Sequence, residues 1–222
     1  SYDNLEPILA LCNLKNEFAS FSLHDEEMLL LGLKNGALFF TMYFTPARII
    51  YEKTKSVYPV APAKQIERML SCTIGRFDRC VENARRFYSI AVSDTGITGN
   101  GKIIFMLHKA VSLMCQAVLV CLGGIRIKAA GLNGLMQHVG RFSPQLPGIF
   151  NADNNAAKDQ VNEKSNQLLL ILDKGCDPSS YQEDLDVDAA TISLLSAKVG
   201  VFQDVAIKVV LQRLSSFSRG IL

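Results

Sequence analysis

The sequence has little net charge and no pattern of metal ligands. Its 23 lysine and arginine residues are almost balanced by 21 aspartate and glutamate residues, which leaves a formal net charge of +2. This charge is too small to attract nucleic acid over the whole surface, although it allows a local basic patch. None of the six cysteines forms a Cys-x-x-Cys pair, and the three histidines are not spaced with cysteines as zinc ligands are. We therefore predict no metal site and no cofactor.

The cysteines and the first residues of the chain indicate the cellular compartment in which the protein is expected. Several cysteines lie within apolar runs, where a free thiol behaves as a small hydrophobic group, and free thiols are typical of a reducing compartment. The first residues lack the basic and apolar pattern of a secretory signal. We therefore expect a cytoplasmic protein.

One stretch, residues 105–122, is apolar and long enough to raise the question of a membrane span. However, His108, Lys109 and Gln116 interrupt it, and a charge in the middle of a membrane costs about 3 kcal/mol. A helix that is apolar on nearly all sides is also what the core of a globular protein requires. We therefore predict a buried core helix and no association with a membrane.

Hydrophobic residues make up 49% of the chain, and most of them recur at helical spacing. The segments with this period span about 62–91, 102–122, 132–139, 153–174 and 186–214. Gly123 and Gly124 are expected to end the second helix, and Asp186 or Asp188 to cap the fifth. Pro144 and Pro147 are expected to force an extended link after the third. Five helices with short connections predict a mainly α fold, an up-and-down helical bundle.

Residues 1–58 are predicted to form a small, irregular α/β segment. The acidic residues 25–27 are well placed to begin a helix that continues to about Phe44. Residues 18–23 and 48–51 have the weaker pattern of short strands. Pro59 and Pro62 then mark the linker to the helical bundle.

The sharpest local motif is Gly96-Ile-Thr-Gly-Asn-Gly101-Lys102. Its spacing is that of a phosphate-binding P-loop, in which backbone N–H groups and a lysine at the start of a helix hold phosphates. Against this interpretation, Ile103 stands where a hydroxyl should bind magnesium, and the residues before Gly96 follow a helical rather than a strand period. Glycine and asparagine are also what a turn between two helices uses. A P-loop NTPase is therefore kept as an alternative.

His108 lies within the most apolar of the predicted helices. A lone histidine in such a helix is more often a core residue with a satisfied hydrogen bond than an acid–base catalyst. The sequence shows no Ser–His–Asp or Cys–His arrangement that would supply a nucleophile. We therefore predict no catalytic residue.

Three stretches together resemble the HEPN domain family. Phe105-Met-Leu-His108-Lys-Ala110 is similar to the signature of that family's central helix, which reads Phe or Leu, then Leu-His-Gln-Ala. Residues 124–132 resemble its Gly-aromatic-Arg-Pro-Lys-Thr-His-Asn-Leu turn, and residues 181–187 its Arg-Tyr-Lys-x-x-Tyr loop. The resemblance implies a HEPN-like helical domain over 59–222. Residues 1–58 resemble the tail of a degenerate nucleotidyltransferase-like domain followed by a linker.

The resemblance also implies a function. The RNase branch of the family uses an arginine followed a few residues later by a histidine, and here no histidine has an arginine at that distance. We therefore expect a degenerate module that binds a nucleotide or RNA without RNase activity and that pairs with a second copy or another protein. The expected ligand-binding residues are the cations Lys102, Arg126 and Lys128, with His108 and Tyr181 as orienting groups.

Two other functions stay open at this point. The first is an active enzyme, either the P-loop NTPase or an RNase that uses an unconventional pair of Lys102 and His108. The second is a module of the antitoxin type that only binds other proteins. Nothing in the motifs alone decides between these functions and the binding module.

Overall fold

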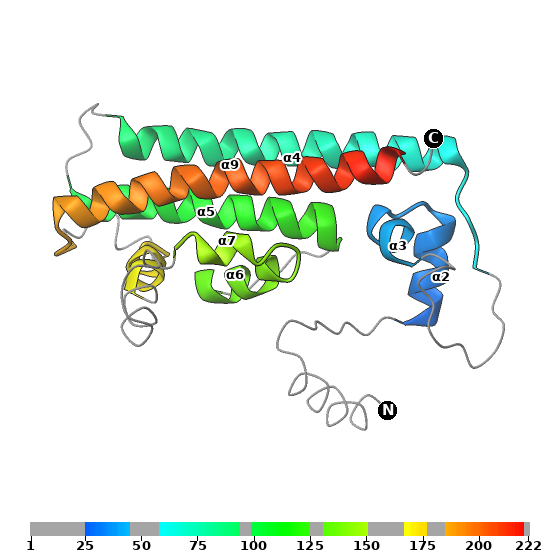
Figure 1. Cartoon of the computed structure of the whole chain (residues 1–222), viewed down its shortest axis with the longest axis horizontal. Helices are drawn as coiled ribbons and strands as arrows, with labels where there is room; N and C mark the ends of the chain where they lie inside the picture. The colour runs from blue at the N-terminus through cyan, green and yellow to red at the C-terminus, as the bar shows by residue number, and fades with distance from the viewer. Residues whose placement is uncertain are drawn as a thin grey trace, which may run out of the picture.

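Three long helices form the framework of the molecule (Figure 1). They are α4 (Ala63–Val92), α5 (Asn100–Gly123) and α9 (Ala189–Arg219). α5 runs antiparallel to α4 and in the same direction as α9, and each of the three contacts the other two. The computed structural model describes residues 25–44, 58–93, 99–124, 131–150, 167–176 and 185–219. Within these ranges the chain is mainly helical, as predicted, and contains no strand.

α5 is the central helix. It contacts α4, α9 and the shorter helix α6 (Leu132–Gly140), and it also contacts α3 (Leu38–Tyr43). Ile104, Leu107 and Val111 are fully buried because neighbours cover α5 on several sides. Among the described helices it is the one long and apolar enough to cross a membrane. Its packing confirms the prediction of a core helix.

α4 and α9 have the amphipathic character that their sequences predict. On α4, Phe77, Val81 and Ala84 are buried, while the charged residues lie on the other side. On α9, Leu195 and Phe202 are fully buried. The carboxylate of Asp188 caps α9, because it accepts hydrogen bonds from the backbone N–H (2.8 Å) and the hydroxyl (2.6 Å) of Thr191. These hydrogen bonds lower the pKa of Asp188.

Shorter helices pack beside α5 and α9. They are α6, the single turn α7 (Gln145–Gly148), and a helix over 167–174. The backbone N–H of Leu132 donates to Asp173 Oδ1 (2.9 Å), so the side chain of Asp173, in the helix over 167–174, caps the start of α6. The first part of the predicted helix over 153–174 lies outside the described residues.

The prediction of an extended link at Pro144 and Pro147 is wrong. Pro144 has the helical angles φ −59° and ψ −20°, and Pro147 lies within α7. Both prolines are tolerated there because φ near −65° suits a helix, and the first turn of a helix needs no N–H donor.

The predicted helix from the acidic residues to Phe44 is two helices. Asp25 caps α2 (Glu26–Lys34) by accepting from the backbone N–H of Glu27 (2.9 Å), as its sequence indicates. Gly36 then adopts φ +65°, which turns the chain before α3. Figure 1 shows α2 and α3 at one end of the long helices. The strands predicted over 18–23 and 48–51 lie outside the described residues.

Candidate functional site

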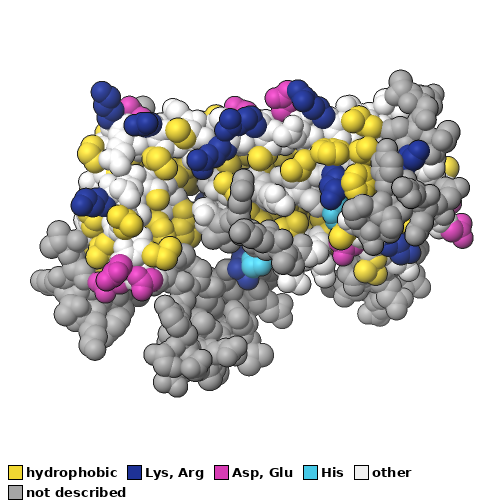
Figure 2. Space-filling view, turned by 180° about the vertical axis from the view of Figure 1, so that it is seen from behind, with side chains coloured by type: hydrophobic (Ala, Val, Ile, Leu, Met, Phe, Trp, Pro, Cys, Tyr) yellow, Lys and Arg dark blue, Asp and Glu magenta, His cyan; other side chains and the backbone are white. Residues whose placement is uncertain are grey.

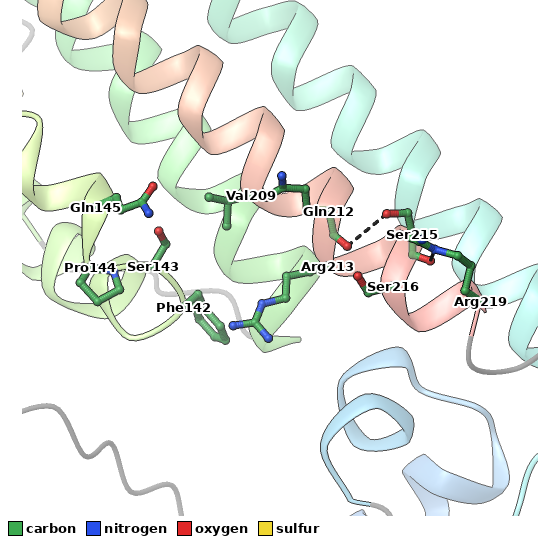
Figure 3. A pocket seen from close by; sticks show the side chains of 10 residues that line it. All are labelled: Phe142, Ser143, Pro144, Gln145, Val209, Gln212, Arg213, Ser215, Ser216 and Arg219. Atoms are coloured by element: carbon green, nitrogen blue, oxygen red, sulfur yellow. Dashed lines mark hydrogen bonds between the residues drawn. The ribbon is translucent and has the colours of Figure 1, made fainter.

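A groove of about 650 Å³ lies between the last turns of α9 and the turn that joins α6 to α7 (Figure 3). Its described lining residues are Phe142, Ser143, Pro144, Gln145, Val209, Gln212, Arg213, Ser215, Ser216 and Arg219. The α9 residues recur every three or four positions, so they share one side of the helix. The opposite side carries Val210 and Leu214, which are buried in the core.

Two contacts hold the α6–α7 segment against α9 and so shape the groove. The Nζ atom of Lys198 donates to the carbonyl oxygen of Ile149 (2.7 Å). The buried rings of Phe150 and Phe202 lie with their centroids 5.5 Å apart. Neither contact uses a described lining residue of the groove, so both hold its walls without filling it.

The groove is basic. It contains the guanidinium groups of Arg213 and Arg219, and none of its described lining residues is acidic. Among the described residues Arg213 has no ion-pair partner, and the Nε atom of Arg219 donates only to the carbonyl oxygen of Ser215 on its own helix (3.4 Å). Both side chains are exposed. Two uncompensated guanidinium groups with neighbouring hydroxyl and amide groups form a site for an anion.

An aromatic ring forms part of the opposite wall. Phe142 is half-buried at the turn after α6, and Figure 3 shows the side chain of Arg213 pointing toward it. The turn is held by the backbone N–H of Ser143, which donates to the carbonyl oxygen of Val139 (3.2 Å). Gln145 adds an exposed amide to the same wall. The groove therefore combines a flat apolar surface with cationic and neutral donors.

Of the sequence-predicted site residues, the structure describes Lys102 and His108, and both lie on α5 away from this groove. Lys102 lies in the first turn of α5, is half-buried and has interactions within the protein. Arg126, Lys128 and Tyr181 lie outside the described residues. Neither Lys102 nor His108 lines the groove beside α9.

His108 is a core residue whose two ring nitrogens both have protein partners. Nδ1 lies 2.9 Å from the carbonyl oxygen of Leu172, and Nε2 lies 3.1 Å from the hydroxyl of Ser112. A carbonyl can only accept, so Nδ1 carries the proton and Nε2 accepts from Ser112. Burial lowers the pKa of His108, which favours this neutral form. The arrangement leaves no ring nitrogen for a ligand or for proton transfer.

The surroundings of the glycine-rich motif are those of a helix–helix connection. α4 continues to Val92, so a helix precedes the motif where a P-loop requires a strand. Gly99 has φ +117° just before α5. The side-chain amide of Asn100 donates to the carbonyl oxygen of Val187 (2.7 Å), which holds the start of α5 to the segment before α9. Residues 94–98 lie outside the described residues.

Sequence reasoning missed the groove because its two walls are far apart in the chain. The polar residues in the last turns of α9 and the run Phe142-Ser-Pro-Gln145 are visible in the sequence. However, neither group is a motif alone, and only the packing of α7 on α9 brings them together. A scan of protein-family models, a search of curated proteins and a search of solved structures found no match to this chain.

Proposed function

We propose that this protein is a degenerate HEPN-type helical module that binds a nucleotide in the groove between α9 and the α6–α7 turn, without cleaving RNA. The observation that carries the proposal is Arg213, which points toward the Phe142 ring, together with Arg219 further along α9, in a groove whose described lining has no carboxylate. α4, α5, α6, the helix over 167–174 and α9 follow one another in the order of the five helices predicted from the hydrophobic period, and the proposal requires this order.

The chemistry of the groove suits a phosphorylated ligand. A guanidinium group can hold a phosphate through two parallel N–H···O bonds, and Arg213 and Arg219 supply two such groups. The hydroxyls of Ser215 and Ser216 lie between them on α9. Phe142 offers a ring on which a base can stack, as aromatic residues do in nucleic-acid-binding proteins. A volume of about 650 Å³ is within the range of small-molecule sites.

Binding rather than catalysis is supported by what surrounds the groove. The described lining residues include serines but no histidine, aspartate or glutamate that could act as a general base. Among the described residues there is also no cluster of three His, Cys, Asp or Glu side chains that could hold a metal ion. The resemblance also predicts that Arg126, Lys128 and Tyr181 contact the ligand, and this stays a prediction.

Calorimetric titration with ATP, with and without magnesium, tests this proposal. A hydrogen bond to a charged group contributes about 1.5–3 kcal/mol. Replacing both cations in Arg213→Gln/Arg219→Gln should therefore weaken ATP binding by about tenfold or more. Because the described lining of the groove has no carboxylate to hold a metal ion, the affinity of the unchanged protein should not require magnesium.

The matched control is Lys64→Gln/Arg85→Gln, which removes the same charge from exposed positions of α4 outside the groove. This variant should bind ATP as the unchanged protein does. Equal affinity in both double variants would show that the groove is not the site. ATP binding that needs magnesium and is lost in Lys102→Ala would instead favour the P-loop alternative.

A further inference from the structure

A second groove lies between α4 and α5, away from α9. Its volume is about 650 Å³, and its described lining residues are Arg76, Arg79, Cys80, Asn83, Gln116, Val120 and Gly124. None of them lines the groove beside α9. Figure 2 shows Lys and Arg side chains gathered over α4, next to a band of hydrophobic side chains. The two grooves are therefore separate sites with different surroundings.

The α4 wall of this second groove belongs to an arginine stripe. Gln65, Arg68, Cys72, Arg76, Arg79, Asn83 and Arg86 recur every three or four positions and so share one side of the helix. This stripe contains four arginines and no acidic residue. Glu82 borders this stripe, three positions after Arg79 and four before Arg86, and it pairs with Arg86 at 2.6 Å.

Arg76 and Arg79 provide the free charge of the stripe. Both are exposed, and among the described residues neither has an ion-pair or hydrogen-bond partner. They are three positions apart, or about 4.5 Å along the helix axis. Two guanidinium groups one turn apart, without a carboxylate nearby in the described lining, are suited to a ligand with more than one negative charge.

The α5 wall adds aliphatic and amide groups. α5 contains no aspartate or glutamate between Asn100 and Gly123. On the side that faces this groove, Val120 and Leu113 are half-buried and Gln116 between them is exposed. The amides of Gln116 and Asn83 face the groove from its two walls and can each both donate and accept. Amides of this kind can pair with the N–H and C=O groups of a peptide backbone.

We propose that the groove between α4 and α5 docks an acidic segment of a partner protein. Carboxylates of the segment would pair with Arg76 and Arg79, and an aliphatic side chain would lie on Val120. Alternate residues of an extended peptide are about 7 Å apart, and two long arginine side chains can reach carboxylates at this separation. No aromatic ring is present among the described lining residues, so this groove lacks the surface on which bases stack. This feature favours a peptide over a nucleic acid strand and distinguishes this groove from the one with Phe142.

Fluorescence anisotropy with two labelled probes tests this inference. One probe is a short synthetic peptide rich in Asp, Glu and Leu, and the other is a uridine oligonucleotide of equal net charge. The peptide should bind the unchanged protein saturably. Its affinity should fall about tenfold or more in Arg76→Gln/Arg79→Gln, because both charge-assisted pairs are lost. Val120→Asp should weaken binding too, because it places a like charge against the peptide.

The variant Arg213→Gln/Arg219→Gln is the control, since it removes the same charge from the other groove. It should bind the peptide normally, so that failure of this inference is distinguishable from failure of the nucleotide proposal. Circular dichroism of the variants checks that these exposed substitutions leave the fold intact. The inference is overturned if the peptide does not bind, if Arg76→Gln/Arg79→Gln leaves its affinity unchanged, or if the oligonucleotide binds this groove more tightly.

Discussion

The Nδ1 atom of His108 lies 2.9 Å from the carbonyl oxygen of Leu172, so a buried imidazole ties α5 to the helix over 167–174. The next residue, Asp173, accepts from the backbone N–H of Leu132 and so caps α6. Two consecutive residues of one short helix therefore connect the central helix to the start of α6. The histidine that most resembles a family signature has a structural role in this fold.

His108→Ala should destabilise the protein by about 2–4 kcal/mol. The substitution leaves a cavity and removes the hydrogen bond to the carbonyl oxygen of Leu172. Ser112→Ala removes only the hydroxyl that donates to Nε2 and should cost about 1 kcal/mol. Urea denaturation of the two variants and the unchanged protein measures both losses. Unchanged stability of His108→Ala together with lost ATP binding would contradict the structural role and indicate a ligand contact.

Stability should decrease as the pH falls below about 6.5. Burial lowers the pKa of His108 below its ordinary value of 6.5, so the unfolded chain takes up a proton at a higher pH than the folded chain does. Protonation of the unfolded state then favours unfolding in this range, whereas above it both states are neutral and the effect vanishes. Burial also lowers the pKa of His138, which acts in the same direction. Urea denaturation across this pH range measures how the free energy of unfolding changes with pH. This change should be smaller in His108→Gln than in the unchanged protein.

Two glycines should respond in opposite ways to alanine. Gly124 has φ +62°, and a Cβ atom there would lie 2.9 Å from the Cβ of Phe39, so Gly124→Ala should cost about 1–3 kcal/mol. Gly75 lies on an exposed position of α4, and its added Cβ would meet no described atom within 4 Å. Gly75→Ala should therefore stabilise the protein by about 0.5–1 kcal/mol, because alanine is the better helix former. Thermal denaturation of both variants tests whether their stabilities change in opposite directions. A loss of stability in Gly75→Ala would contradict this prediction.

Phe142→Leu should separate base recognition from phosphate recognition. Stacking of a base on an aromatic ring contributes about 1–3 kcal/mol, so the variant should bind ATP more weakly than the unchanged protein does. Inorganic triphosphate has no base and should bind both proteins equally. Calorimetric titration with each ligand makes the comparison. Equal loss for both ligands would mean that the substitution disturbs the groove itself rather than a stacking contact.

Most of the helices could be predicted because their patterns are local. The apolar stripes of α4 and α9 and the nearly continuous apolar run of α5 require only the helical period and the need to bury hydrophobic surface. The same reasoning placed the acidic residues 25–27 at one helix start and Asp186 or Asp188 at another, and the structure shows Asp25 and Asp188 accepting backbone N–H groups there. It failed at Pro144 and Pro147, because proline permits a helical turn as readily as an extended link when the first N–H groups need no partner. It also missed the break at Gly36, where the turn depends on a positive φ angle.

The candidate site was less predictable than the helices. The sequence pointed to His108 through a resemblance, but the structure shows both of its ring nitrogens engaged by Leu172 and Ser112. Arg213 and Phe142 carried no signal, since an arginine late in a helix and a phenylalanine before a proline occur in many proteins. Their importance depends on being on facing walls, and that is a property of how α7 packs on α9.

The sequence by itself determined that this protein is mainly helical, that α5 is buried, and that α4 carries four of its five arginines on one side, because periodicity acts between residues a few positions apart. The tertiary structure alone decided which charges are left without partners and which surfaces form grooves. Those properties depend on contacts between distant segments, such as Lys198 with Ile149, and such contacts have no local pattern in the chain.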